Sequence, residues 1–295
     1  MDINRKQHEV LRRASLFLEE NQREPKMAEL LLQHYLGVSR AKFFTMMRED
    51  VPEDVLSDFQ DALSKHAETG VPLEHITGFA PFYGRHFLVN EHTLIPRPET
   101  EELIEMVLQS LPAEIEAEPI TIADIGTGSG IIAITLALEL PQAVVYATDI
   151  SAKALKVAGK NAERLGADIT FLQGDYLEPL IEQQIKPDIV IANPPYISLD
   201  EKTLLSDTVK NFDPAEALFA DENGLGAYKA ISNRLRSTLN PDGGSVFFEI
   251  GDRQGKDVQR LLKSALPEID VSVIRDMNGK ERIVHGTYGM LSSDQ

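Results

Sequence analysis

The stretch IADIGTGSGII, residues 122–132, decides the fold, because it joins an apolar strand to an apolar helix through a loop with three glycines. Glycine lets the backbone approach a ligand closely, and the N-terminus of the following helix offers free N–H groups. The loop therefore predicts a ligand site at the end of a strand. By itself this signal is weak, because a tight strand–helix turn needs glycine in any case.

The spacing of the loop separates it from one common class of binding site. Its glycines follow the pattern G-x-G-x-G, at Gly126, Gly128 and Gly130. The dinucleotide-binding fingerprint needs its third glycine one position later, where this chain has Ile131. The pattern therefore argues against a nicotinamide dinucleotide as the ligand.

Two acids accompany the loop. Asp124 precedes it, and Asp149 ends the next predicted strand, 19 positions after Gly130. This offset suits an acid that binds ribose hydroxyls. The alternative for Asp149 is a cap on the following helix, although Ser151 can supply that cap itself. We favour the ribose role.

Strands and helices alternate from residue 120 onward. The predicted strands are 120–125, 143–149, 169–174, 187–192, 244–250, 269–275 and 281–287. The predicted helices are 131–140, 151–165, 224–239 and 254–265. Alternation with apolar strands predicts a parallel sheet covered by helices on both faces. Asn278-Gly279 favours a hairpin between the last two strands, so we expect the final strand to be antiparallel.

The region before residue 98 has a different texture. Residues 3–66 read as helices, with apolar stripes at Val10, Ala14 and Phe17 and at Val55, Phe59 and Leu63. Two β-rich runs then flank Asn90-Glu91-His92, which suggests a hairpin. We expect a helical bundle over 1–80, a β-hairpin linker over 81–97 and an α/β domain over 98–295.

Composition excludes several classes of protein. The formal net charge is −18, which opposes binding to nucleic acid phosphates unless a basic patch intervenes. The chain has no cysteine, so disulfides, thiolate metal sites and cysteine nucleophiles are excluded, in keeping with a reducing cytoplasm. We recognise no signal peptide and no apolar run long enough to span a bilayer, and we assign none of the seven histidines to a metal.

The tetrapeptide Asn193-Pro194-Pro195-Tyr196 directly follows the apolar run PDIVIA. Its strand should end at the same sheet edge as the glycine loop. The Asn193 side-chain oxygen and the Pro194 carbonyl can each accept one N–H of a planar amino group, which would aim its nitrogen at an electrophile. The prolines would hold these acceptors rigidly, and Tyr196 would give a flat group a packing surface. A proline-rich turn without function is the alternative for the tetrapeptide taken alone.

Together, Asp124, the glycine loop and Asp149 resemble the S-adenosylmethionine site of Rossmann-like (class I) methyltransferases. This resemblance implies a seven-stranded, mostly parallel sheet with an antiparallel last strand. It also implies that the loop, with Thr127 and Ser129, passes the methionine part of the cofactor and that Asp149 binds the ribose. The acid after the third strand should lie near adenine, which points to Asp175 and Tyr176. Tyr176 could equally be a core aromatic residue.

The wider sequence is similar to the release factor glutamine methyltransferases (the PrmC/HemK family). The motifs that carry this likeness are VPLEHITGFAPFYGRHF, LIPRPETEEL, ADIGTGSGIIAI, NPPYIS, DPAEALFADENGLGAYKAI and FFEIGDRQG, in that order. The resemblance implies methylation of the glutamine in the Gly-Gly-Gln motif of class I peptide release factors, with the helical bundle helping to dock the factor. It also implies that Arg97–Thr100 borders the cofactor pocket. Pro98-Glu99-Thr100 also reads as a well-formed helix start, and both interpretations can hold at once. The family often has Trp where this chain has Tyr176, and Glu-Pro where it has Asp213-Pro214.

Three other functions remain open on sequence grounds. They are a ribosomal-protein glutamine methyltransferase, a DNA or RNA adenine amino-methyltransferase, and a non-catalytic S-adenosylmethionine sensor. The acidic charge disfavours the nucleic acid substrate, which would have to be flipped out of its stack and held by its phosphates. We expect a cytoplasmic monomer that binds release factors, with no stable nucleic acid partner and no membrane.

Overall fold

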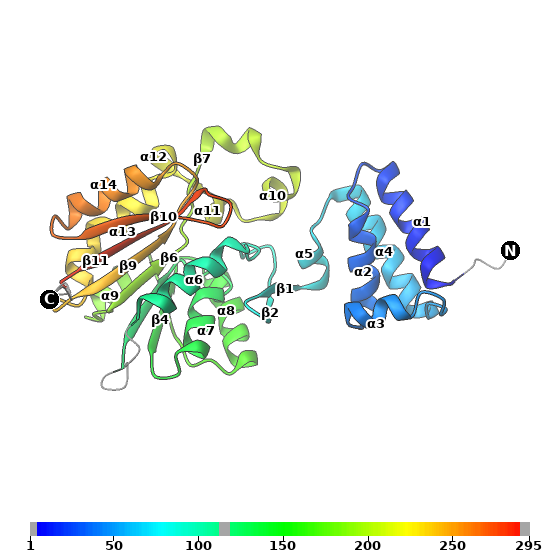
Figure 1. The fold of residues 1–295 in the computed structure, drawn as a ribbon, viewed down its shortest axis with the longest axis horizontal. Coiled ribbons are helices and arrows are strands. Elements are labelled where there is room, and N and C mark those ends of the chain that lie inside the picture. The colour runs from blue at the N-terminus through cyan, green and yellow to red at the C-terminus, as the bar shows by residue number, and fades with distance from the viewer. Residues whose placement is uncertain (1–4, 112–118, 290–295) are drawn as a thin grey trace. The chain divides into compact units, whose positions relative to one another are not determined.

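The computed structural model describes residues 5–111 and 119–289, so residues 3 and 4 of the predicted helical region lie outside it. The chain divides into two compact units. Figure 1 colours the chain by residue number, from blue at the N-terminus to red at the C-terminus. One unit contains the chain up to Gly78 together with Ser206–Phe212, and the other contains Phe79–Leu205 and the chain from Asp213 onward. The first unit is therefore discontinuous in sequence.

The first unit is helical. Its elements are α1 (Gln7–Glu20), α2 (Lys26–Leu36), α3 (Arg40–Thr45), α4 (Glu53–Thr69), α5 (Leu73–Thr77) and α10 (Asp207–Phe212). The predicted stripe on α4 is confirmed, since Val55, Phe59 and Leu63 pack into one apolar cluster. The stripe on α1 is wrong at one position: Phe17 is exposed, and Leu18 is buried in its place. Leu18 lies four residues after Ala14 and so shares its face of the helix.

A two-stranded hairpin opens the second unit. It consists of β1 (Phe79–Phe82) and β2 (Arg85–Leu88), paired antiparallel with Phe82 opposite Arg85. The predicted turn at Asn90–His92 is therefore wrong, because the chain turns at Tyr83-Gly84. Both residues have positive φ, 48° and 70°, as a two-residue hairpin of this hand requires. A tyrosine rarely adopts that conformation, which is why the sequence hid the turn.

The centre of the second unit is a seven-stranded sheet in the order β10-β11-β9-β6-β3-β4-β5. Its strands are β3 (Thr121–Ile125), β4 (Val144–Asp149), β5 (Thr170–Gln173), β6 (Ile189–Ala192), β9 (Gly244–Glu249), β10 (Asp270–Arg275) and β11 (Glu281–Tyr288). The pairs among β5, β4, β3, β6 and β9 are parallel, whereas β11 is antiparallel to both β9 and β10. The predicted mostly parallel sheet with an antiparallel last strand is confirmed.

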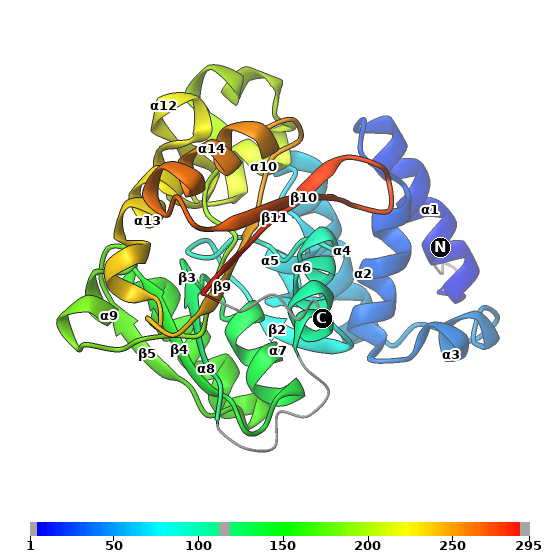
Figure 2. The same ribbon diagram turned by 60° about the vertical axis from the view of Figure 1, so that its left-hand side comes forward.

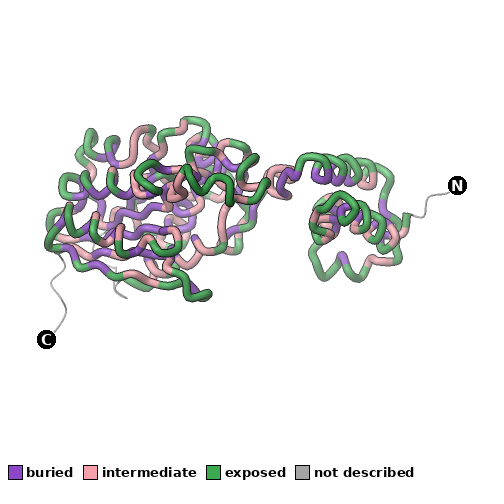
Figure 3. The backbone as a smooth tube through the Cα atoms, turned by 90° about the horizontal axis from the view of Figure 1, so that it is seen from above, coloured by how far each residue is buried: buried purple, intermediate pink, exposed green. Residues whose placement is uncertain are grey.

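Helices cover both faces of this sheet, as Figure 2 shows. They are α6 (Glu99–Ser110), α7 (Ile131–Glu139), α8 (Ala152–Leu165), α9 (Glu178–Glu182), α13 (Gly226–Thr238) and α14 (Gly255–Ala265). Side chains of β6 alternate between two buried clusters: Ile189 and Ile191 pack with α6, α7 and α8, and Val190 and Ala192 with α9, α13 and α14. Alternation with a period of two is what a strand buried on both faces requires. Figure 3 colours the backbone by burial and shows buried segments in the interior of this unit.

The chain between β6 and α13 holds short elements that the sequence did not predict. They are β7 (Ile197–Ser198), the 3₁₀ helix η1 (Leu199–Leu204), α10, α11 (Ala215–Leu218), β8 (Phe219–Ala220) and α12 (Asp221–Gly224). Each is too short to show hydrophobic periodicity. β7 and β8 pair in parallel, which brings the chain after Pro195 beside the chain after α11.

Within the described ranges, no helix combines the length and the apolar character needed to cross a membrane.

Candidate active site

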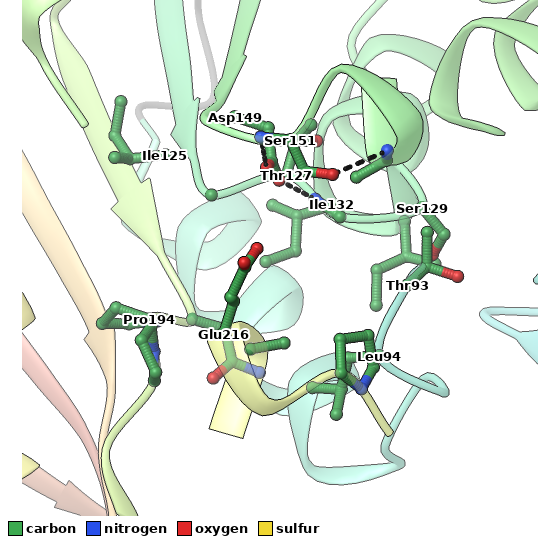
Figure 4. A pocket seen from close by; sticks show the side chains of 18 of the residues that line it. Thr93, Leu94, Ile125, Thr127, Ser129, Ile132, Asp149, Ser151, Pro194 and Glu216 are labelled. Atoms are coloured by element: carbon green, nitrogen blue, oxygen red, sulfur yellow. Dashed lines mark hydrogen bonds between the residues drawn. The ribbon is translucent and has the colours of Figure 1, made fainter. Parts of the chain in front are cut away.

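A cavity opens at the carboxyl ends of the central strands (Figure 4). Gly126 follows β3, Asp149 ends β4 and Asn193 follows β6, and all three line the cavity. Because β3 lies between β4 and β6, the cavity is at the point where the strand order reverses, the place where open α/β sheets bind ligands. Its volume is about 1110 Å³ with its open mouth included.

The cavity collects most of the residues that the sequence singled out. Those in its wall are Arg97, Thr100, Gly126, Thr127, Gly128, Ser129, Asp149, Asp175, Tyr176, Asn193, Pro194 and Pro195. Among the described residues, Asp124, Gly130 and Tyr196 are the predicted site residues that lie outside this wall.

The glycines of the loop serve two different purposes. Gly126 and Gly128 have φ of 74° and 58°, and a Cβ on either would meet nothing within 4 Å. They therefore shape the backbone and leave the space beside it open. Gly130, with φ of 84°, is packed instead: a Cβ there would lie 2.8 Å from Ile134 Cδ1 and 3.1 Å from Ala158 Cβ. This glycine permits α7 to begin close against α8.

Asp124 is buried behind the loop. Its Oδ2 accepts hydrogen bonds from Thr127 Oγ1 at 2.6 Å and from the backbone N–H of Ala133 at 3.2 Å. Burial raises the pKa of this carboxyl to about 7, against the effect of both hydrogen bonds. Asp124 thus ties the loop to the first turn of α7, which is a supporting position for the cavity wall.

Asp149 is in the wall and holds the loop as well. Figure 4 shows its two hydrogen bonds: Oδ2 accepts from the N–H of Gly128 at 2.9 Å, and Oδ1 from the N–H of Ser151 at 2.8 Å. Ser151 Oγ accepts from the N–H of Ala154 and so caps α8 itself. Burial raises the pKa of Asp149. Each carboxylate oxygen keeps a lone pair for a further donor, such as a hydroxyl of a ligand.

Asp175 and Tyr176 follow β5. Tyr176 lines the cavity and also packs against the buried cluster that includes α13. Its carbonyl accepts a hydrogen bond from Thr148 Oγ1 at 2.8 Å. Asp175 forms an ion pair with Arg234 at 3.3 Å.

The corner at Asn193 is connected to the start of α6. The Asn193 side-chain Nδ2 donates to Thr100 Oγ1 at 3.2 Å, and Thr100 Oγ1 donates to Glu249 Oε2 at 2.7 Å. Pro194 is buried and Pro195 is half-buried. Tyr196 turns away from the cavity and packs on the core cluster, and its carbonyl accepts from Gln254 Nε2 at 3.0 Å.

Arg97 is fixed from the segment after α10. Its Nη2 lies 2.7 Å from Oδ2 of Asp213, whose side chain is only 1% exposed. Asp213 Oδ1 also accepts from the N–H of Ile95. Asp213, which stands where the family often has Glu, therefore anchors the segment before α6 through its carboxylate.

The sequence did not single out several residues of the site. Glu249 was the most visible of them, because it is an acid at the end of an otherwise apolar strand, and burial raises its pKa to about 7. Glu216 projects into the cavity from α11 (Figure 4), and Thr93 and Leu94 form part of the wall. These last three lie in segments without regular periodicity, so nothing in the sequence pattern marked them.

Comparisons with known proteins agree along nearly the whole chain. The PrmC N-terminal domain family matches residues 9–78, and the methyltransferase small domain family matches residues 102–214. The release factor glutamine methyltransferase of Bacillus cereus is 44% identical over 277 residues, which cover 94% of this chain and 97% of that protein. The Bacillus subtilis protein of the same name is 43% identical over 277 residues, covering 94% and 96%.

Among solved structures, the catalytic domain of hMettl16 in complex with MAT2A 3′UTR hairpin 1 matches with a TM-score of 0.52 and 16% identity. The match covers 83% of this chain and 85% of that one. At this identity it supports the fold alone, which is the Rossmann-like fold of class I methyltransferases.

Proposed function

Since this chain belongs to the family of release factor glutamine methyltransferases, we propose that it methylates the glutamine of the Gly-Gly-Gln motif in class I peptide release factors, on the side-chain amide nitrogen. S-adenosylmethionine is the methyl donor. The observation that carries this proposal is one cavity that joins the glycine loop and Asp149 to the Asn193-Pro194-Pro195 corner.

The residues of the cavity fit S-adenosylmethionine. Asp149 offers acceptor oxygens for ribose hydroxyls, and the glycine loop leaves open space where side chains would otherwise project. Tyr176 and Ile150 supply apolar surface beside Asp175, which suits an adenine ring with its amino group. When bound, this cofactor supplies a sulfonium methyl group for attack by the amide nitrogen, with S-adenosylhomocysteine as the other product.

The acceptor side of the cavity must deal with a poor nucleophile, because the lone pair of an amide nitrogen is delocalised. In our proposal the Asn193 side-chain oxygen and the Pro194 carbonyl each accept one N–H of the glutamine amide. Two fixed acceptors would orient the nitrogen and stabilise the positive charge that develops on it. The buried Pro194 keeps its carbonyl in place, and the proton released in the reaction passes to water.

Tyr196 is assigned a supporting role in this proposal. Its ring packs on the core cluster, and burial raises the pKa of its hydroxyl. It therefore stays neutral at physiological pH and supports the corner from behind. The earlier expectation that its ring contacts the substrate directly requires the corner to move when the release factor binds.

Partner and location follow from the same proposal. The enzyme acts in the cytoplasm, as a monomer, and recognises its release factor as a protein. A stable nucleic acid partner is not expected, since the formal net charge of −18 opposes phosphate binding. Ribosomal-protein glutamine methylation remains the second candidate, because the same acceptor chemistry serves it.

The test offers purified protein and methyl-labelled S-adenosylmethionine to a release factor, ribosomal proteins, and DNA and RNA, and locates the label by peptide mass. We expect one methyl group on the Gly-Gly-Gln glutamine. Asn193→Ala should retain cofactor affinity in calorimetry and lose about 100-fold or more in kcat. The control Asn278→Ala, in the exposed turn between β10 and β11, should leave both unchanged. Label on nucleic acid and none on the release factor would overturn the proposal.

A further inference from the structure

Three side chains from distant parts of the second unit form a single hydrogen-bonded row. Asn193 follows β6, Thr100 is in the first turn of α6, and Glu249 ends β9. The distances are 3.2 Å from Asn193 Nδ2 to Thr100 Oγ1 and 2.7 Å from Thr100 Oγ1 to Glu249 Oε2. Thr100 and Glu249 are each 1% exposed, so water does not compete for these bonds.

The direction of the bonds in this row follows from the chemistry of its far end. An ionised carboxylate has no proton to give, so it can only accept, and the single hydroxyl proton of Thr100 must point to Glu249. The oxygen of Thr100 then has only lone pairs left for Asn193. The side-chain amide of Asn193 must therefore turn its NH₂ group toward Thr100, which leaves its oxygen as the free end of the amide.

We propose that Glu249, acting through Thr100, is a positioning residue that fixes the orientation of the Asn193 amide, so that an oxygen and not an NH₂ group faces the substrate amide. This inference rests on the proposed function and deepens it. Neither Glu249 nor Thr100 contacts the reacting atoms; both determine which atom of Asn193 is presented.

The orientation matters because the two ends of a side-chain amide have nearly the same shape and opposite hydrogen-bonding character. A reversed Asn193 would place N–H donors against the N–H donors of the substrate glutamine. Buried N–H donors that face each other have no acceptor, which destabilises the arrangement in which the substrate amide can react. The ionised carboxylate of Glu249 thus keeps the Asn193 side-chain oxygen facing the substrate as a hydrogen-bond acceptor.

The charge state of Glu249 is set by groups on several elements. Burial disfavours the ionised form most strongly, and Glu99 on α6 also disfavours it. The hydrogen bond from Thr100, the charge of Arg282 on β11 and a hydrogen bond from Asn193 favour it. Tyr196 lies near Arg282, and Tyr228 of α13 donates its hydroxyl proton to the backbone carbonyl of Glu249 at 2.8 Å. Protonated Glu249 could donate to Thr100 and so permit the reversed amide. We therefore expect kcat to rise with pH as Glu249 ionises near neutrality.

A purely structural role for the row would give a different result. Glu249 and Thr100 join β9 to α6, so their loss could simply loosen the packing of α6. The test must therefore separate presentation of the amide from stability of the fold.

The first experiment compares Thr100→Val with Thr100→Ser. Valine keeps the shape of threonine and removes both hydrogen bonds, whereas serine keeps the hydroxyl. We expect Thr100→Val to lower kcat about tenfold or more at unchanged S-adenosylmethionine affinity, and Thr100→Ser to restore most of it. The matched control is Thr135→Val in α7, also fully buried, whose hydroxyl finds no hydrogen-bond partner among the described residues.

The second experiment observes Asn193 directly, without turnover. In ¹⁵N-labelled protein the side-chain NH₂ resonances of Asn193, assigned by their loss in Asn193→Ala, should shift in Thr100→Val and in Glu249→Gln and stay in place in Thr135→Val. Glu249→Gln can donate as well as accept, so it should also flatten the rise of kcat around pH 7.

The outcomes distinguish the two proposals. Wild-type kcat and unshifted Asn193 resonances in a folded Thr100→Val protein would overturn the positioning role. An equal fall in kcat for Thr100→Val and Thr100→Ser, tracking their loss of stability, would also overturn it. If the Asn193 resonances shift in Thr100→Val and Glu249→Gln but the wild-type protein methylates no release factor, the proposed function fails and the positioning role stands.

Discussion

The two sides of the cavity are held in place by contacts of very different range. On the cofactor side, the bonds that hold the glycine loop to Asp124 and Asp149 join near neighbours. They span 3 positions between Thr127 and Asp124 and 21 positions between Gly128 and Asp149. On the acceptor side, Asn193 and Thr100 are 93 positions apart, and Thr100 and Glu249 are 149 apart. The cofactor side is therefore a local motif, and the acceptor side exists only once the whole sheet has formed.

This difference predicts how each side fails. A local motif fails when its own backbone is strained, and the damage should appear in cofactor affinity. A side assembled from distant segments fails when a long-range bond is lost, and the damage should appear in turnover or in stability. The predictions below test this division from the largest expected effect to the smallest.

The largest effect should come from Gly130→Val, which strains the glycine loop at its most tightly packed position. Positive φ disfavours a β-branched residue, and its Cβ would overlap Ile134 and Ala158. We expect a loss of about 3 kcal/mol or more in the free energy of unfolding, measured by urea denaturation, together with weakened cofactor binding. The control Gly166→Val has φ of 74° and open space around its Cβ, so it should cost clearly less. Equal losses would show that close packing at Gly130 is unimportant.

The next largest effect should come from Arg97→Met, which removes a bond between residues 116 positions apart. This change leaves the buried carboxylate of Asp213 without its cationic partner. Stranding a buried charge costs about 2–3 kcal/mol of stability, reduced here because Arg97 itself is partly exposed. The double variant Arg97→Met with Asp213→Asn should recover part of this loss.

The control for Arg97→Met is Arg236→Met, which removes an exposed pair with Glu268 and should cost less than about 1 kcal/mol. If Arg97→Met were no more costly than this control, the segment before α6 would not depend on Asp213.

Asp149→Asn should separate the two sides of the cavity clearly, because it lowers the affinity for S-adenosylmethionine and leaves the acceptor side unchanged. The amide keeps the shape of the carboxylate but loses the charge and one acceptor oxygen. We expect S-adenosylmethionine affinity to fall about tenfold or more in calorimetry, with kcat at saturating cofactor nearly unchanged. The exposed Asp242→Asn is the control. A fall in kcat without a change in affinity would contradict the assignment of Asp149 to the cofactor side.

The last prediction is a dependence of stability on pH, which amounts to at most about 1.4 kcal/mol over any one pH unit. Burial raises the pKa of Asp124 to about 7, whereas it is about 4 in the unfolded chain. The folded state therefore binds more protons than the unfolded state between these values, and the contribution of Asp124 to stability falls as pH rises from about 4 to 7.

Asp124→Asn removes this titration. The difference in unfolding free energy between wild type and Asp124→Asn should change with a slope of at most about 1.4 kcal/mol per pH unit in that window. It should be constant above about pH 8. A difference that is flat from pH 5 to 8 would show that Asp124 does not titrate there.

The same contrast explains which parts of the fold and of the site could be predicted from the sequence. The glycine loop, Asp149 and the Asn193 corner were predictable, because each is encoded within a few consecutive residues at the end of an apolar strand. The seven strands were also predictable, because each is a short segment with local apolar residues and most of them alternate with helices along the chain. Thr100 was marked only by its motif, and its hydroxyl proved to be engaged with Glu249 and Asn193.

What escaped the sequence depends on contacts between distant segments or on unusual backbone. Glu249 gains its role only through Thr100, and Asp213 only through Arg97 and Ile95. The hairpin turn was misplaced because Tyr83 adopts positive φ, which residue statistics disfavour. Glu216 belongs to a four-residue helix, too short for any periodic signal.

The discontinuity of the helical unit bears on how such a protein can be altered as a gene. Ser206–Phe212 is grouped with the helices that precede Gly78, and the rings of Phe212 and His75 meet edge to face within that unit. A cut after residue 78 would therefore remove most of the unit and leave one of its pieces behind in the remaining polypeptide. Recombination that exchanges this unit between homologues must carry two separate coding segments, so the N-terminal portion is not a freely transferable cassette.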